Sequence, residues 1–150
     1  NGHAMRSIGL DMSELGLIKC VSKLIDSMKI FTHCQQYTGG LSYSGVTMAL
    51  VHGGQPDALI LCHEPTRAHM RGLPDYTLPT LEELRDLSLT LARRVNPDVQ
   101  VVGISVNTQH MSDDEANAYL AGLEAEFGLP AVDPFRHGAG KLVDALVAVT

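Results

Sequence analysis

A short stretch near the middle of the chain concentrates side chains that could bind a charged ligand. Six ionisable residues fall within thirteen positions: His63, Glu64, Arg67, His69, Arg71 and Asp75. The planar guanidinium of arginine suits carboxylate or phosphate oxygens, and an adjacent imidazole and carboxylate could orient a bound molecule. We therefore expect a site for a small anionic molecule here. The alternative is that the carboxylates and guanidiniums of this stretch pair with one another and only brace a long loop.

The same stretch contains part of a zinc-binding pattern. His63-Glu64 matches the start of the HExxH helix, in which two histidines four positions apart bind zinc. The position four after His63 holds Arg67, and Pro65 between them excludes a regular helix. A loop could still bring His63, Glu64 and His69 around a metal ion, which stays an alternative. Our prediction is that the chain holds no metal.

A second pattern, near the end of the chain, resembles a phosphate-binding loop. Gly138, Gly140 and Lys141 suggest it, but the Walker motif needs a glycine five residues before its Gly-Lys pair and a serine or threonine after it. Those two places hold Phe135 and Leu142, so the motif is absent. We expect these glycines to form the entry to the last helix, whose N-terminus could still attract an anion.

Two of the predicted helices begin with a capping box. Thr80 with Glu83, and Ser112 with Glu115, place a hydroxyl residue three positions before a glutamate, ahead of an apolar periodic run. The first of these helices should end near Pro97, because proline cannot continue a helix. The other helices are predicted over 14–29, 45–52 and 141–149.

Short continuous apolar runs bounded by turn residues predict strands that are covered on both faces, as in a parallel sheet. The runs are 58–62, 99–106 and 129–132. Strands that alternate with helices through short connections favour parallel pairing and right-handed crossovers. The predicted fold class is α/β, with a three-layer, mostly parallel sheet and flanking helices. Residues 30–41 are difficult to assign, although glutamines and glycines at 35–40 suggest a loop.

The carboxyl ends of these strands supply further candidate ligand-binding residues. Asn107 and Thr108 follow the second predicted strand, and Asp133 and Arg136 follow the third. Open α/β sheets usually bind ligands just beyond the carboxyl ends of their strands. These four residues are therefore expected to line one cleft together with the stretch that begins at His63, although no residue can be given a catalytic role.

Composition and charge narrow the class of partner. The chain of 150 residues is 45% apolar and 19% charged, with a net charge of −6 and no basic run, which argues against nucleic acid or a membrane surface as a partner. No apolar run approaches the roughly 20 residues that span a bilayer. Three widely spaced cysteines without a CxxC motif fit reduced thiols in a cytoplasmic protein. We interpret residues 1–12 as a leader or tag remnant and residues 13–150 as one α/β domain.

The predicted helix at 14–29 allows two interpretations. Its apolar positions form a narrow, near-heptad stripe, with lysines on the other face. The stripe could pack on the core of its own domain, or it could form a seam with a second copy of the chain. From the second interpretation we expect a homo-oligomer.

Several longer runs resemble the C-terminal half of a bacterial P-loop family, formerly a domain of unknown function, which includes D-glutamate N-acetyltransferases of D-amino-acid metabolism. The resemblance covers about residues 42–146, and the runs that carry it are YSGVT (43–47), HGGQPDALILCHEP (52–65), RGLPDY (71–76), LPTLEEL (78–84), VVGISVNT (101–108) and DPFRHGAGKLVDAL (133–146). The phosphate loop of this family, of the GTDxxxGKM type, has no counterpart in the sequence.

The resemblance implies the distal half of a P-loop-NTPase-like fold, without the P-loop. Family members also resemble dethiobiotin synthetase in their nucleotide-binding half. By that similarity, Asn107-Thr108 would approach a nucleotide base and His63-Glu64 would lie on the neighbouring loop. The cofactor implied by the resemblance is a nucleotide or acetyl-CoA.

Three functions follow from the sequence, and whether the chain is an enzyme stays open. The first is a truncated or recombined relative of this family that binds a small anionic ligand, an acidic amino acid or a nucleotide. Arg67 and Arg71 would clamp the anion, and Glu64 and His63 would orient it. The second is a non-catalytic, homo-oligomeric assembly module that uses the 14–29 helix. The third is an intact acyltransferase or nucleotide-dependent enzyme, which the missing phosphate loop disfavours.

Overall fold

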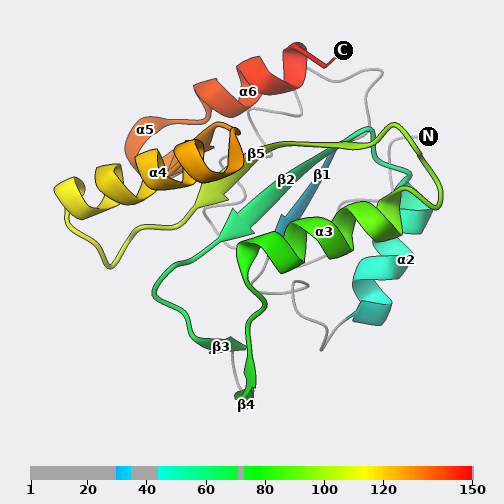
Figure 1. Cartoon of the computed structure of the whole chain (residues 1–150), viewed down its shortest axis with the longest axis horizontal. Helices are drawn as coiled ribbons and strands as arrows, with labels where there is room; N and C mark the ends of the chain where they lie inside the picture. The colour runs from blue at the N-terminus through cyan, green and yellow to red at the C-terminus, as the bar shows by residue number, and fades with distance from the viewer. Residues whose placement is uncertain (1–29, 35–43, 71–72, 150) are drawn as a thin grey trace.

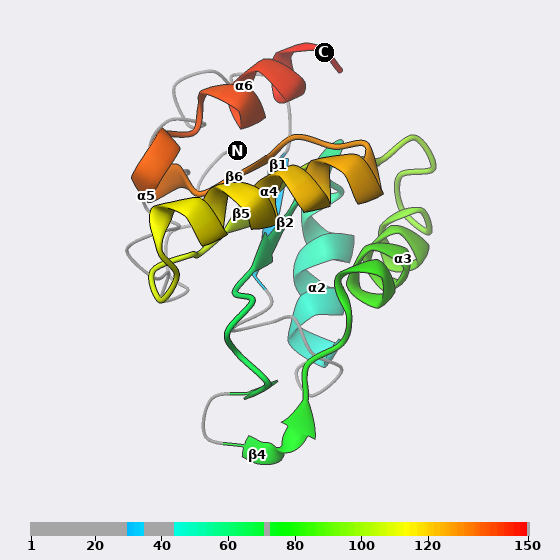
Figure 2. The same cartoon turned by 60° about the vertical axis from the view of Figure 1, so that its left-hand side comes forward.

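The core of the molecule is a four-stranded, entirely parallel sheet with the strand order β1-β2-β5-β6. A computed structural model describes residues 30–34, 44–70 and 73–149. Helices cover both faces of the sheet, so the domain has three layers (Figures 1 and 2). The elements are β1 (Ile30–Cys34), α2 (Ser44–Gly54), β2 (Ala58–His63), β3 (His69–Met70), β4 (Leu73–Thr77), α3 (Leu81–Ala92), β5 (Gln100–Val106), α4 (Asp113–Phe127), β6 (Ala131–Val132), α5 (Pro134–His137) and α6 (Gly140–Val147).

Alternate side chains of the central strand β2 enter different apolar clusters on the two faces of the sheet. Ile60 packs in a cluster with Leu142 and Leu146 of α6. Leu61 packs on the opposite face, in a cluster supplied by α3 and α4. Because both faces of β2 are covered, its sequence is a continuous apolar run rather than an alternating one. This accounts for the strand prediction at 58–62.

The capping residues predicted from sequence define the beginnings of the two longest helices. The hydroxyls of Thr80 and Ser112 accept the backbone N–H of Glu83 and Glu115, and each glutamate side chain accepts the N–H of its cap residue. At the end of α4, Gly128 adopts a left-handed conformation with φ of 63°, which glycine tolerates without strain. These local contacts fix where each helix meets the sheet.

The structure adds elements that the sequence did not predict. Residues 30–34, which were difficult to assign, form strand β1, which pairs in register with β2. The loop expected after β2 contains a short antiparallel hairpin, β3–β4, and α5 precedes the final helix. Helix α3 ends at Ala92, earlier than the predicted end near Pro97. The predicted helix at 14–29 and the suggested loop at 35–40 lie outside the described residues.

In the part of the chain that the structure describes, no helix is both long and apolar enough to span a membrane. The observed parallel sheet with helices on both faces confirms the predicted α/β fold class.

Candidate functional site

The carboxyl ends of β2 and β5 lie side by side and place their following residues together. His63 is the register partner of Val106, and the backbone N–H of Asn107 donates to the carbonyl oxygen of His63 over 2.8 Å. The ladder thus continues one residue beyond β5. The side chain of Asn107 accepts the backbone N–H of Gln109 over 3.2 Å, which tightens the turn that leaves the strand. The residues that follow β2 and β5 therefore lie next to each other at the carboxyl edge of the sheet, as the sequence predicted. We call this edge the rim.

Glu64 and Arg67 form an ion pair directly after β2. The Nε and Nη2 atoms of Arg67 lie 3.1 and 3.0 Å from the same oxygen, Oε2 of Glu64. The side chain of Glu64 is 8% exposed and that of Arg67 is 23% exposed. The carboxylate is therefore nearly buried, and it holds a guanidinium that still reaches solvent. An arginine held in this way loses little rotamer freedom when it binds a further anion.

His63 contacts Tyr119, a residue of α4 that the sequence analysis did not include in the site. The Nε2 atom of His63 lies 2.8 Å from the hydroxyl oxygen of Tyr119, and the two rings stack with centroids 6.0 Å apart. Burial lowers the pKa of the His63 imidazole below its usual value, and the negative charge of Glu64 offsets part of this effect. The sequence alone does not indicate this contact, because it joins residues 56 positions apart.

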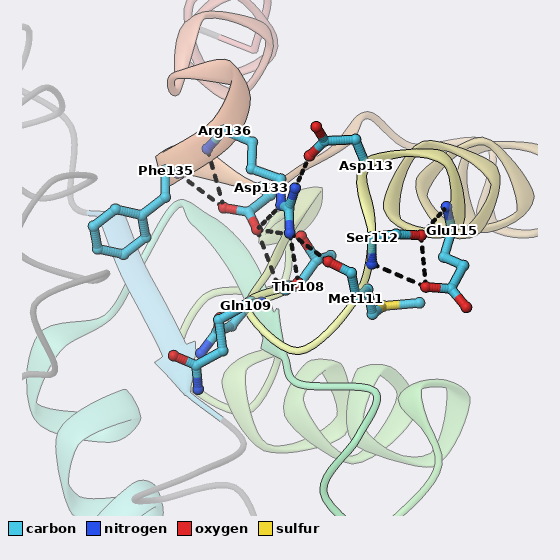
Figure 3. A network of polar contacts seen from close by, with 10 residues as sticks. Thr108, Gln109, Met111, Ser112, Asp113, Glu115, Asp133, Phe135 and Arg136 are labelled. Atoms are coloured by element: carbon cyan, nitrogen blue, oxygen red, sulfur yellow. Dashed lines mark hydrogen bonds and ion pairs between the residues drawn. The ribbon is translucent and has the colours of Figure 1, made fainter.

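Asp133 and Thr108 connect the ends of β5 and β6 (Figure 3). Oxygen Oδ2 of Asp133 accepts the backbone N–H of Thr108 over 2.9 Å and the Thr108 hydroxyl over 2.5 Å. Oxygen Oδ1 of Asp133 accepts the backbone N–H groups of Phe135 and Arg136, and so caps α5. Both Asp133 and Thr108 are almost completely buried. Their side chains brace the rim from inside.

The guanidinium of Arg136 is also engaged by protein groups (Figure 3). It forms an ion pair with Asp113 at the start of α4, and its Nη2 donates to the carbonyl oxygens of Thr108 and Met111 over 3.1 and 2.6 Å. These contacts tie α5 to the loop between β5 and α4. Arg136, which was expected to line the ligand cleft, thus braces this loop.

The remaining predicted site residues lie on or beside the hairpin. Asp75 is an exposed residue of β4, and His69 is an exposed residue at the start of β3. The hairpin projects away from the sheet on the side opposite α6, and both views separate it from α5 (Figures 1 and 2). Arg71 lies outside the described residues. The structure therefore brings together His63, Glu64, Arg67 and Asn107, and places Asp75 on a separate projection.

The lysine that suggested a phosphate loop is engaged by a side chain of another helix. Lys141, which suggested a phosphate loop, forms an ion pair with Glu124 of α4 over 2.8 Å. Among residues 30–34, 44–70 and 73–149, no group of three or more His, Cys, Asp or Glu side chains is placed to hold a metal ion.

Comparison with known proteins identifies the family of this parallel α/β domain. The model of the domain of unknown function DUF1611, described as its C-terminal P-loop domain, matches residues 20–143. The chain belongs to this family, which confirms the resemblance seen in the sequence.

Two curated relatives carry the name D-glutamate N-acetyltransferase. The relative from Tritonibacter scottomollicae is 74% identical over 109 residues, which cover 73% of this chain and 33% of that protein. The relative from a Pseudoalteromonas species is 47% identical over 102 residues, which cover 68% of this chain and 31% of that protein. The chain thus spans about a third of the length of the curated relatives that it matches.

A solved structure shows the same fold. A crystal structure of a DUF1611 family protein from Anabaena variabilis matches with a TM-score of 0.62 and 36% sequence identity. The match covers 67% of this chain and 30% of that protein.

Proposed function

We propose that this domain contributes part of the binding site for an acidic amino acid, D-glutamate, in a protein that transfers an acetyl group to it. The high identity to two proteins named D-glutamate N-acetyltransferase supports the choice of ligand. The position of the site supports it too, because the residues lie beyond adjacent parallel strands. We propose the acetyl transfer only for a protein of the relatives' full length. Each of the two relatives is about three times as long as the segment that matches this chain.

The observation that carries the proposal is the guanidinium of Arg67, held by Glu64 at the end of β2. Arginine has five N–H donors in a rigid fork, and the contacts with Glu64 use Nε and Nη2. A ligand carboxylate could accept hydrogen bonds from the remaining donors. The amide of Asn107 lies on the neighbouring strand end and would supply an uncharged hydrogen-bonding edge.

The proposal predicts that Arg67→Ala weakens D-glutamate binding to the 150-residue chain. A lost hydrogen bond to a charged group is worth about 1.5–3 kcal/mol, so the affinity should fall roughly 10- to 150-fold. Isothermal titration calorimetry with D-glutamate measures the effect, and L-glutamate, phosphate, Mg-ATP and acetyl-CoA serve as competing ligands. Thermal unfolding in the absence of ligand shows whether the variant remains folded.

Arg94→Ala is the matched control. Arg94 is an exposed arginine just after α3, and Asn96, two residues further on, donates to the carbonyl oxygen of Pro56, which precedes β2. Arg94 therefore lies at the amino-terminal edge of the sheet, opposite the proposed site, and its replacement should leave the affinity unchanged. If Arg67→Ala binds D-glutamate as tightly as the wild-type chain does, or if the wild-type chain shows no saturable binding, the proposal is wrong.

A further inference from the structure

The ion pair between Glu64 and Arg67 places a negative charge beside the group that is proposed to bind an anion. The Nε and Nη2 atoms of Arg67 lie 3.1 and 3.0 Å from Oε2 of Glu64, and the side chain of Glu64 is 8% exposed. Water and salt screen a nearly buried charge much less than an exposed one. Any anion that Arg67 binds therefore also experiences the charge of Glu64.

The contacts with Glu64 occupy one edge of the Arg67 guanidinium. The N–H groups of Nη1 and the second N–H group of Nη2 point along the other edges of the planar group. A bound anion would accept hydrogen bonds from these donors, on an edge next to the one that Glu64 occupies. The ligand and Glu64 would then share a single positive charge at a separation of only a few ångströms.

Other groups that the structure describes at the rim add little uncompensated positive charge. Burial lowers the pKa of His63, so its ring is mostly neutral at neutral pH. The guanidinium of Arg136 forms an ion pair with Asp113, and its Nε atom lies 3.8 Å from Oδ2 of Asp133. Both arginines described at the rim are thus matched by carboxylates, which disfavours a ligand with a second negative charge.

We infer that Glu64 is a specificity-determining residue of the candidate site: its carboxylate offsets the charge of Arg67, so that a carboxylate with one negative charge is accepted and a dianion such as sulfate is rejected. The acidic amino acid as the preferred ligand rests on the proposed function. Glu64 also has other contacts, and its replacement by glutamine removes one negative charge whatever they are. A purely structural side chain would change the affinity for all anions by the same factor.

The test compares D-glutamate with sulfate, which carries two negative charges at neutral pH, in the wild-type chain and in Glu64→Gln. Glutamine has nearly the same shape as glutamate, and its side-chain oxygen can still accept hydrogen bonds from Arg67. Isothermal titration calorimetry at constant ionic strength measures both affinities. A unit charge at a few ångströms changes the affinity on the order of tenfold for each charge of the ligand. The ratio of sulfate affinity to D-glutamate affinity should therefore rise about tenfold in Glu64→Gln.

Two further variants serve as controls. Glu64→Asp keeps the charge and shortens the side chain, so the ratio of the two affinities should stay near the wild-type value even if both affinities fall. Asp98→Asn removes the same charge from an exposed residue just before β5, at the amino-terminal edge of the sheet. It should leave the ratio unchanged. Thermal unfolding without ligand shows which variants remain folded.

The outcomes separate this inference from the proposed function. Equal changes of both affinities in Glu64→Gln would show that Glu64 is structural, and a wild-type chain that binds sulfate more tightly than D-glutamate would overturn the inference without any variant. If the wild-type chain does not bind D-glutamate, the proposed function fails. Sulfate then still decides the role of Glu64: a gain of sulfate affinity in Glu64→Gln supports it, and equal affinities or no binding by either chain overturn it.

Discussion

The carboxylate of Asp133 accepts hydrogen bonds from residues that belong to different elements. One oxygen binds the backbone and the hydroxyl of Thr108 at the end of β5, and the other caps α5. The residue is 2% exposed, so water cannot replace these partners if the carboxylate is removed. Removal of the Asp133 carboxylate should therefore lower the free energy of unfolding, because buried N–H and O–H donors would be left unsatisfied.

At the residue scale, we predict that Asp133→Ala lowers the free energy of unfolding by about 2–4 kcal/mol. Unsatisfied buried donors cost about 1–3 kcal/mol each, and the loss of a helix cap costs about 0.5–2 kcal/mol. Chemical denaturation followed by circular dichroism measures the change. Asp144→Ala, at an exposed position of α6, should stay within about 0.5 kcal/mol of the wild-type value. Equal stabilities of the two variants would show that the buried contacts of Asp133 contribute little.

The role of Asp133 also shows what sequence can predict about the candidate site. The sequence placed His63, Asn107 and Asp133 correctly at strand ends, because strand boundaries depend on local patterns of apolar and turn residues. It could not separate residues that face a ligand from residues that brace the rim. That distinction depends on pairs such as Thr108 with Asp133, which lie 25 positions apart and meet only after the strands have aligned.

Helix α6 packs closely against Gly103 of β5. A Cβ atom built on Gly103 would lie 2.4 Å from Cδ2 of Leu142 and 3.2 Å from the carbonyl oxygen of Pro130. Leu142 is completely buried in the apolar cluster under α6, so its side chain has little room to move. The absence of a side chain at Gly103 therefore sets the separation between the helix and the sheet.

At the element scale, we predict opposite effects of two glycine-to-alanine substitutions. Gly103→Ala should reduce the free energy of unfolding by about 1–3 kcal/mol, because overpacking displaces α6 or Pro130. Gly122→Ala should increase it by about 0.5–1 kcal/mol, because Gly122 lies inside α4 with nothing within 4 Å of an added Cβ. Thermal and denaturant unfolding of both variants test the pair. Stabilisation by both substitutions would show that α6 adjusts freely to a larger residue in β5.

The elements differed in how well sequence predicted them, and the reasons are physical. Helices α3 and α4 were predicted because a capping box is a local signal complete within four residues. Strand β1 was missed because its identity comes from pairing with β2, 28 positions further along the chain. Hairpin β3–β4 was missed because β3 has only two residues and β4 contains Pro74, which weakens a strand pattern.

At the scale of the whole molecule, we propose that the chain forms a homo-oligomer through the helix predicted at 14–29. An apolar stripe of near-heptad spacing could pair with the same stripe of a second copy. Multi-angle light scattering should then give a multiple of 16.2 kDa. Leu24→Glu, in the stripe, should shift the mass to that of the monomer, whereas Lys23→Glu, on the polar face, should not. A wild-type monomer at high concentration would exclude this mode of assembly.

The network of Thr108, Asp133 and Arg136 also affects how the rim fluctuates. The carboxylate of Asp133 accepts hydrogen bonds from Thr108 at the end of β5 and from Phe135 at the start of α5, so neither segment can separate without taking partners from a buried carboxylate. Arg136 of α5 also donates to the carbonyl oxygens of Thr108 and Met111 in the loop before α4. Local opening in proteins occurs in contiguous cooperative units, and each unit has a single opening free energy. We therefore expect the backbone amides of Thr108, Phe135 and Arg136 to belong to one such unit and to exchange their hydrogens with solvent at one rate. We expect this side of the candidate site to open as a block.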